Sequence, residues 1–273
     1  MRLPLFLPAL LVSSAFAAET YLLKEPDEAL GLSVETLSVA KNSTTTTRTE
    51  GGVRTSHKAD VVRWRQWNRT FRDDALGGKV HYRMLRDEVT TRLDGDERTQ
   101  AGPLHGRIAM GQRNGAGNWV FTLEEGAAVG DQVTELESIQ AIENRRWLPN
   151  RKVAIGETWE FTPQFIRNTL RRDVKNAVAV GLMELVAVDK MPDGGRQARI
   201  KVVVRAGGEE VKSAREVVGA EGMLSGEMTV ELDRPGAMVL RLAGTVVSEA
   251  KVGTTGAVAR IPVTLRFESE PLP

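Results

Sequence analysis

Residues 227–242 read EMTVELDRPGAMVLRL, and this stretch indicates the fold class more clearly than any other. Every second residue is apolar on both sides of a central Arg234-Pro235-Gly236-Ala237 segment. Alternation with a period of two is typical of a β-strand that has one covered face and one solvated face. Proline restrains φ at the second position of the central segment and glycine accepts a positive φ at the third, which suits a type II turn. The stretch therefore predicts an antiparallel hairpin.

The same alternation extends through the C-terminal half of the chain. The expected strands cover about residues 177–190, 199–205, 227–233, 238–242 and 260–268. In the first of them, Val178, Val180 and Leu182 share one phase. Turns are expected at Asp193-Gly194-Gly195 and at Ala206-Gly207-Gly208, because adjacent glycines favour chain reversal. These segments predict a meander of about five antiparallel strands.

The N-terminal half has a similar but less regular pattern, with a hairpin turn at Glu50-Gly51-Gly52. Its expected strands are residues 32–49, 53–71, 80–92, 108–112 and 119–123. Two segments are expected to be short helices. One runs from a capping Asp131 to about Arg146, and the other covers 163–172, after the Thr162-Pro163 start signal. The chain is therefore predicted to be mainly β, with antiparallel meander sheets in a sandwich or half-barrel and two short helices, or α+β in detail.

The first 17 residues have the features of an export signal. Arg2 precedes a short apolar run, and Ala15-Phe16-Ala17 matches the small-x-small rule of signal peptidase cleavage. The run is too short to span a bilayer, and no other segment reaches the length of a transmembrane helix. We therefore expect a soluble protein that is periplasmic or secreted after cleavage near Ala17. The rest of the chain divides near residue 147 into a β-rich half that ends in a helix, 18–147, and a half with a short helix and an antiparallel sheet, 148–273.

A block of the form P-x-x-x-V-x-x-G-[DE]-[ST]-W follows this boundary. It runs from Pro149 through Val153 and Gly156 to Trp159. The block resembles a recurring element of an uncharacterised family of exported bacterial β-rich proteins with a domain of unknown function. The resemblance implies an exported β-rich fold, and it implies no catalytic or ligand-binding residues. From the residues themselves, we expect Gly156 to allow a tight turn and Trp159 to fill the core.

Composition argues against several kinds of chemistry. The chain has no cysteine, which excludes disulfide scaffolds and thiol catalysis. Its three histidines, His57, His81 and His105, form no metal-binding motif, and neither a G-x-S-x-G nor a phosphate-binding glycine motif is present. We therefore expect no metal, no cofactor and no enzymatic activity. Lys and Arg together number 37 against 36 Asp and Glu, and this balance does not favour a nucleic acid partner.

One stretch combines arginines with aromatic residues in a way that suits binding. Residues 62–72 read VRWRQWNRTFR. Arginines can pair with anions, and the aromatic rings can stack. The predicted partner contacts are Arg63, Trp64, Arg65, Trp67 and Arg69, and the partner could be an envelope protein, an anionic glycan or a lipid. In the alternative interpretation, the arginines only stack on aromatic rings along the outer face of a sheet.

The apolar faces of the expected C-terminal strands need a cover. Five strands about 20 Å long and about 4.8 Å apart present roughly 480 Å². The helix expected over 163–172 covers roughly 150 Å² of this area. Either the N-terminal strands close a filled core, or a half-barrel keeps a cavity for a lipid or an acyl chain. Such a cavity is expected to be lined by Met228, Val230, Met238, Leu240, Val263 and Leu265.

Two roles follow from these patterns. The first is an exported, non-enzymatic structural or protein- or glycan-binding β module of the cell envelope. The alternative is a periplasmic carrier that binds a lipid or an acyl chain in the half-barrel cavity.

Overall fold

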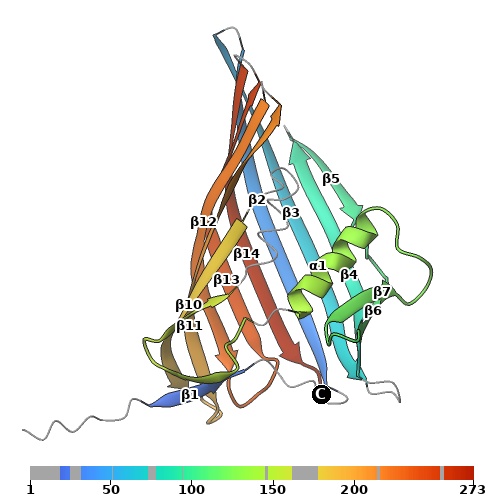
Figure 1. The fold of residues 1–273 in the computed structure, drawn as a ribbon, viewed down its shortest axis with the longest axis vertical. Helices are drawn as coiled ribbons and strands as arrows, with labels where there is room; N and C mark the ends of the chain where they lie inside the picture. Colours follow the sequence, from blue (N-terminus) through green and yellow to red (C-terminus); the bar gives the residue numbers. More distant parts are fainter. Residues whose placement is uncertain are drawn as a thin grey trace, which may run out of the picture.

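A computed structural model of the protein describes residues 19–24, 32–50, 52–72, 78–93, 95–144, 147–161, 178–213, 216–252 and 255–273. Long antiparallel strands form a sheet that is broad at one end and tapers to a narrow tip at the other (Figure 1). This confirms the predicted mainly β, antiparallel fold. The expected export signal, 1–17, and the expected helix, 163–172, lie outside the described residues.

The described elements are fourteen strands and one helix. The strands of the N-terminal half are β1 (Thr20–Leu23), β2 (Ser33–Glu50), β3 (Val53–Arg72), β4 (Lys79–Leu93), β5 (Asp96–Ala101), β6 (Ile108–Arg113) and β7 (Trp119–Leu123), and helix α1 (Asp131–Glu143) follows them. The C-terminal half contains β8 (Arg151–Ala154), β9 (Thr158–Phe161), β10 (Val178–Lys190), β11 (Arg196–Ser213), β12 (Glu216–Glu231), β13 (Met238–Val252) and β14 (Thr255–Pro271). The strands predicted by alternation are therefore present, although several are longer than expected.

Most of these strands belong to one sheet. Its order is β7-β6-β4-β3-β2-β14-β13-β12-β11-β10-β9, β5 pairs with β4, and β1 and β8 form a separate two-stranded sheet. Strand β14 pairs with β2 from Gly256 opposite Thr49 to Pro271 opposite Val34. The two halves of the chain thus share a single curved sheet and do not form two separate sheets of a sandwich. Strands β7 and β9 end the sheet and are not paired with each other in the described part of the chain, so the sheet is open.

The predicted hairpin in residues 227–242 is present. Met228 and Leu240 are cross-strand partners, and both are buried in the larger core cluster. Gly236 has a φ of 93°, and the N–H of Ala237 donates to the carbonyl of Arg234 over 3.1 Å. Proline and glycine therefore perform the expected roles in the turn.

Two buried clusters stabilise the sheet. The larger cluster covers the inner face of the C-terminal strands and includes Ile200, Val202 and Leu224. Trp159 is buried in it and donates its ring N–H to the carbonyl of Trp147 over 3.0 Å, consistent with the expected core position. The smaller cluster joins strands β3, β4, β6 and β7 to α1 and consists of Phe71, Val80, Tyr82, Met84, Leu104, Ala109, Trp119, Phe121, Leu123 and Leu136.

The turn expected at Ala206-Gly207-Gly208 was wrong. These residues lie inside β11 and pair with β12, where Gly207 opposes Glu221. A Cβ at Gly207 would lie 3.2 Å from the carbonyl oxygen of Ala220, a separation shorter than most real Cβ contacts. Glycine at this position therefore allows close approach of two strands and does not reverse the chain.

In β10, the apolar phase that the sequence suggested faces outward. Val178, Val180 and Leu182 are exposed, whereas Met183 and Leu185 are fully buried. Both phases of this strand are apolar, so alternation alone could not select the buried face. The pairing of β10 with β11 makes that selection.

Candidate ligand cavity

A cavity of about 680 Å³ lies on the concave side of the sheet, near its broad end. Its floor is formed by the central strands β2, β3 and β14, and its sides are formed by α1, β1 and the turn between β12 and β13. From β2, Ser38 and Ala40 face the cavity, because side chains on one face of a strand recur at every second residue. The curvature of the single sheet therefore creates the space, and the short elements near its broad end enclose it (Figure 1).

Apolar and aromatic side chains form one wall of the cavity. The ring centroids of Trp67 and Phe267 are 6.0 Å apart, and those of Trp147 and Phe267 are 5.9 Å apart. Aromatic pairs at such distances pack favourably. The apolar lining residues include Val34, Trp67, Met84, Ile139, Trp147, Leu148, Val230, Leu232, Met238, Leu265 and Phe267.

The structure separates the six residues that the sequence assigned to a cavity. Val230, Met238 and Leu265 line it. Met228 and Leu240 are buried within the larger core cluster, and Val263 packs against that cluster. All six lie on the concave side of the sheet, but only those near its broad end reach the cavity.

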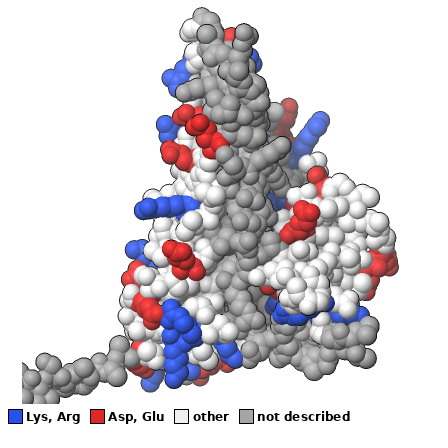
Figure 2. Space-filling view, viewed as in Figure 1, with Lys and Arg blue, Asp and Glu red and all other residues white. Residues whose placement is uncertain are grey.

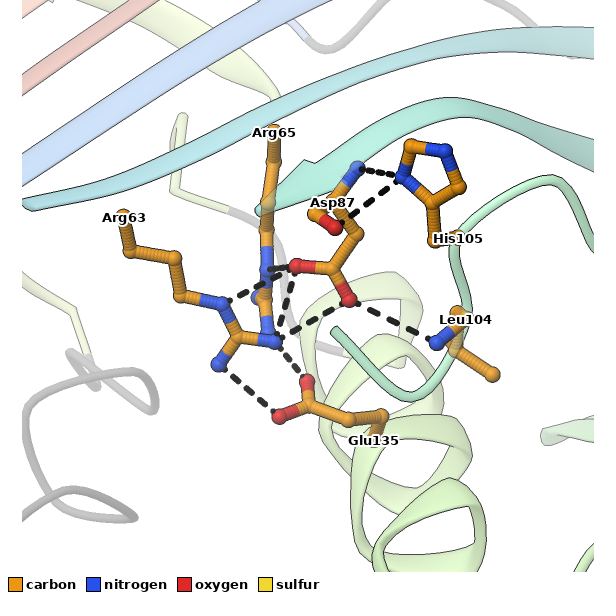
Figure 3. Close-up of polar contacts among 6 residues, drawn as sticks. All are labelled: Arg63, Arg65, Asp87, Leu104, His105 and Glu135. Carbon is orange, nitrogen blue, oxygen red and sulfur yellow. Dashed lines mark hydrogen bonds and ion pairs between the residues drawn. The ribbon is translucent and has the colours of Figure 1, made fainter. Parts of the chain in front are cut away.

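A buried ionic cluster joins α1 to the sheet beside the cavity (Figure 3). Arg63 of β3 donates from Nε to Asp87 Oδ1 over 3.1 Å, and from Nη1 to Glu135 Oε1 over 3.0 Å. Arg65 contacts the same two carboxylates and hydrogen bonds to Glu135. Burial, together with the neighbouring Arg63, lowers the pKa of Arg65. Two guanidinium groups and two carboxylates thus neutralise one another, which reduces the cost of placing charge in a protein interior.

Asp87 is the most enclosed member of this cluster, with 1% of its surface exposed. Its Oδ2 accepts from the N–H of Leu104 over 3.4 Å, and His105 Nδ1 lies 3.2 Å from its backbone nitrogen. Gly102 donates its N–H to the carbonyl of Asp87 over 2.7 Å, and a Cβ at Gly102 would overlap the Asp87 carboxylate. The loop that follows β5 is therefore shaped to receive this buried side chain.

A second contact holds the C-terminal end of α1. Arg69 Nη2 lies 2.7 Å from Glu143 Oε2, and Tyr82 donates its hydroxyl to the same carboxylate. Burial raises the pKa of Tyr82 well above its ordinary value, and the negative charge of Glu143 adds to the shift. Arg69 also lies over the ring of Phe71, 4.0 Å from its centroid. Helix α1 is thus attached to β3 and β4 near both of its ends.

The predicted binding stretch is divided between the two faces of β3. Arg63, Arg65, Trp67 and Arg69 line the cavity, whereas Trp64 lies out of phase with them and carries Arg86 5.1 Å from its ring centroid. Strand alternation explains this division. The three arginines on the concave face engage acidic residues of the same chain and do not form an open outer surface.

Sequence reasoning missed the acidic partners of these arginines. Glu135 and Glu143 lie about two turns apart on α1, so they project from similar sides of the helix. The sequence did contain a signal for these ion pairs. It was the spacing of the two glutamates on the predicted helix, combined with arginines on alternate positions of a predicted strand. Asp87 and Tyr82 gave no signal, because their roles depend on how β3 pairs with β4.

Basic residues also contribute to the cavity lining away from α1. Lys24, Arg113 and Arg196 come from three separate parts of the chain. Figure 2 shows Lys and Arg side chains along the broad end of the molecule, with Asp and Glu side chains among them. Arg196, for example, binds Asp233 through Nε over 3.0 Å. The cavity thus combines an apolar wall with polar and charged groups.

The sequence matches no protein-family model and no curated protein. Among solved structures, it is similar to lipovitellin, described for its lipid–protein interactions, with 10% identity and a TM-score of 0.46 over 90% of this chain and 26% of that chain. An outer membrane channel from Pseudomonas putida F1 has 9% identity and a TM-score of 0.24, with 88% and 96% of the two chains covered. OprD from Pseudomonas aeruginosa has 10% identity and a TM-score of 0.21, with 90% and 62% covered. The chain thus spans about a quarter of the lipovitellin chain, and likeness at these scores carries no functional information.

The described part of the chain contains no helix that is both long and apolar enough to cross a membrane.

Proposed function

We propose that this protein is a carrier that binds an apolar chain, such as a lipid or an acyl chain, in the concave cavity. The observation that carries this proposal is the cavity itself, with its volume of about 680 Å³ and its apolar wall. Small-molecule sites commonly have volumes of about 300–1,000 Å³ and a mainly apolar lining with a few polar groups. We also propose that the carrier acts in the cell envelope after export, on the basis of the N-terminal sequence.

The form of the cavity suits a flexible apolar ligand. Met84 and Met238 line it, and methionine side chains adapt to ligands of variable shape. Burying a methylene group in such a setting contributes about 0.8 kcal/mol, so a chain of several methylenes can bind without a specific polar contact. The charged groups beside α1 would then help to enclose the apolar ligand and need not form specific contacts with it.

The binding-module role relied on Arg63, Arg65 and Arg69 as partner contacts. Because these arginines face the cavity and engage acids of α1 or β4, an anionic partner would have to displace those contacts first. The carrier role requires no such displacement, and we therefore prefer it. The resemblance of residues 149–159 to an exported β-rich family is retained as a proposal and adds only the expectation of export.

The proposal is tested by filling the cavity. Ser38→Trp and Ala40→Trp place indole rings on its floor, and Lys41→Trp places one on the opposite, exposed side of the same strand. We expect the unmodified protein to bind dansyl-labelled undecanoic acid, and the two cavity variants to bind it at least about tenfold more weakly. Lys41→Trp should bind like the unmodified protein.

Fluorescence titration provides the affinities, and native mass spectrometry after gentle extraction should show copurified lipid. Circular dichroism at increasing temperature verifies that each variant is folded. Absence of both probe binding and copurified lipid in the unmodified protein would overturn the carrier role, as would equal loss of binding in all three variants.

A further inference from the structure

The floor of the cavity changes in chemical character from one strand to the next. Cross-strand pairing aligns one residue from each of β14, β2, β3 and β4 in a single row: Phe267, Ser38, Arg65 and Asp87. The row passes from an aromatic ring through a hydroxyl to a guanidinium group and its counter-charge. Beyond Phe267, the apolar lining continues over β12 and β13 with Val230 and Met238. A ligand that lies across these strands would therefore meet apolar groups at one end and polar groups at the other.

Arg65 has a hydrogen-bond donor that the ionic cluster does not use. Its Nε donates to Asp87 Oδ1 over 3.4 Å, and its Nη2 donates to Glu135 (Figure 3). Within the described part of the chain, no group accepts a hydrogen bond from Nη1. The side chain of Arg65 lines the cavity and is 26% exposed, and Nη1 is not one of the fully buried atoms that lack a partner. The two N–H groups of Nη1 thus remain for a group that enters the cavity.

Ser38 supplies a second donor beside Arg65. The two residues are cross-strand partners, and the Cβ atoms of such a pair lie about 4.5–5.5 Å apart. Ser38 also lines the cavity, and its hydroxyl has no hydrogen-bond partner among the residues that the structure describes. A carbonyl oxygen has two lone pairs. The hydroxyl and the guanidinium group together can therefore bind one carbonyl oxygen of a ligand.

The charges around these two donors favour an uncharged acceptor. Arg63 and Arg65 are already balanced by Asp87 and Glu135. Glu135 also lines the cavity, so a carboxylate that approached Arg65 would face it. A third negative charge beside two enclosed carboxylates is costly, whereas a carbonyl oxygen accepts from Nη1 without changing the charge balance. The site therefore disfavours a free acid and favours an ester.

The width of the cavity floor suits an extended acyl chain. Strands β3 and β12 both contribute lining residues, and β2, β14 and β13 separate them in the sheet. Four spacings of about 4.8 Å give about 19 Å from the strand of Arg65 to the strand of Val230. The apolar part of the floor therefore extends away from the two donors by the width of several strands.

We propose that the ligand is an esterified acyl chain, whose carbonyl oxygen accepts hydrogen bonds from Arg65 Nη1 and Ser38 Oγ while the chain extends over Phe267 toward β12. This inference rests on the carrier role and names the class of ligand for the same cavity. The ion pairs that attach α1 stay intact, because Nη1 takes no part in them. The two donors add a selectivity for the ligand head that the apolar wall alone cannot provide.

The test compares three fluorescent probes that share a dansylamide group and an undecyl chain. They end in a methyl ester, a carboxylate or a plain methyl group: methyl 11-(dansylamino)undecanoate, its free acid and N-undecyl dansylamide. Titration at pH 8 should show that the unmodified protein binds the ester about tenfold more tightly than the hydrocarbon probe. The acid should bind no more tightly than the hydrocarbon probe. Because the ester is no more apolar than the hydrocarbon, tighter binding reports the contact with its head.

Two variants assign the head contact to its donors. Ser38→Ala removes the hydroxyl, and Arg65→Lys keeps the positive charge but removes the guanidinium fork. Each should lower the ratio of ester affinity to hydrocarbon affinity at least about threefold. Ser225→Ala and Arg199→Lys, at exposed positions of β12 and β11, are the matched controls and should leave this ratio unchanged. Thermal unfolding followed by circular dichroism verifies that each variant is folded, and Ser38→Ala decides the question if Arg65→Lys does not fold.

Failure of this proposal is distinguishable from failure of the carrier role. The hydrocarbon probe needs only the apolar wall, so its binding reports the carrier role by itself, and its absence would overturn both proposals. Equal affinities for the ester and the hydrocarbon probe would overturn the head site alone, as would a ratio that Ser38→Ala leaves unchanged. Tighter binding of the acid than of the ester would show that the cavity selects an anionic head.

Discussion

The hydroxyl of Tyr82 shows how a single residue links the cavity wall to the helix that covers it. Tyr82 is buried in the smaller core cluster, where its ring lies 5.5 Å from that of Phe121, edge to face. Its hydroxyl donates to Glu143 on α1. Loss of this donor would leave a partly buried carboxylate with fewer partners, and such losses lower the free energy of unfolding.

We expect Tyr82→Phe to lower the free energy of unfolding by about 1–3 kcal/mol near pH 8. The difference in the free energy of unfolding between the unmodified protein and Tyr82→Phe should narrow above about pH 10. Because burial and Glu143 raise the pKa of Tyr82, the unfolded chain loses this proton first, and the unmodified protein loses stability as the pH rises through the folded-state pKa. Tyr82→Phe has no hydroxyl at this position to titrate, so its stability should not fall in this way as the pH rises.

Urea unfolding at pH 8 and at pH 11 measures both effects. Tyr21→Phe, at the only other tyrosine, serves as the comparison for stability at pH 8, since Tyr21 is only partly buried and its hydroxyl bonds to Glu19. A difference between the unmodified protein and Tyr82→Phe that stays constant with pH would show that the hydroxyl does not titrate as proposed.

At the scale of elements, α1 is held to the sheet by charge pairs as well as by apolar contacts. Of the apolar residues at helical spacing, Val133 is exposed, Leu136 is buried and Ile139 packs against the smaller core cluster. Glu135, which alternation of apolar residues does not reveal, is buried beside Leu136. The ion pairs of Glu135 connect residues about 70 positions apart, so local sequence patterns cannot show them.

We expect Glu135→Gln to destabilise the attachment of α1, because Arg63 and Arg65 would retain only Asp87 as a counter-charge. A loss of about 2 kcal/mol is expected, somewhat below the cost of deleting a fully buried ion-pair partner, since glutamine can still accept a hydrogen bond. Glu137→Gln, on the exposed side of the same helix, should change stability by less than about 0.5 kcal/mol.

Hydrogen exchange locates the effect. The amides of α1 should exchange faster in Glu135→Gln, while those of β11 and β12 remain protected. If the two glutamine variants exchanged alike, the charge cluster would not be what holds the helix.

The strands were predictable to a large extent because alternation and turn residues are local signals. The strands at 53–71 and 80–92 were expected within one residue of β3 and β4 at each end. Where both phases are apolar, as in β10, or where glycines lie within a strand, as in β11, local signals gave the wrong face or a false turn. The cavity was predictable only as an alternative, because its walls come from elements that are distant in sequence.

At the scale of the whole molecule, the pairing of β14 with β2 is the feature that sequence could not show. The pairing places β14, near the C-terminus, beside β2, near the N-terminus. This long-range contact joins the two expected β halves into one curved sheet. Without it, neither half would curve around the cavity, whose floor includes residues of both β2 and β14.

We therefore expect that residues 18–147 and 148–273 do not fold separately. Separation would expose the facing edges of β2 and β14, whose paired backbone groups would lose their partners, and unpaired strand edges promote aggregation. Each half expressed alone should lack a cooperative thermal transition by circular dichroism, and coexpression of the two should restore a 1:1 complex with that transition. Cooperative unfolding of either half on its own would show that the boundary near residue 147 separates two independent domains and that the shared sheet is not needed for folding.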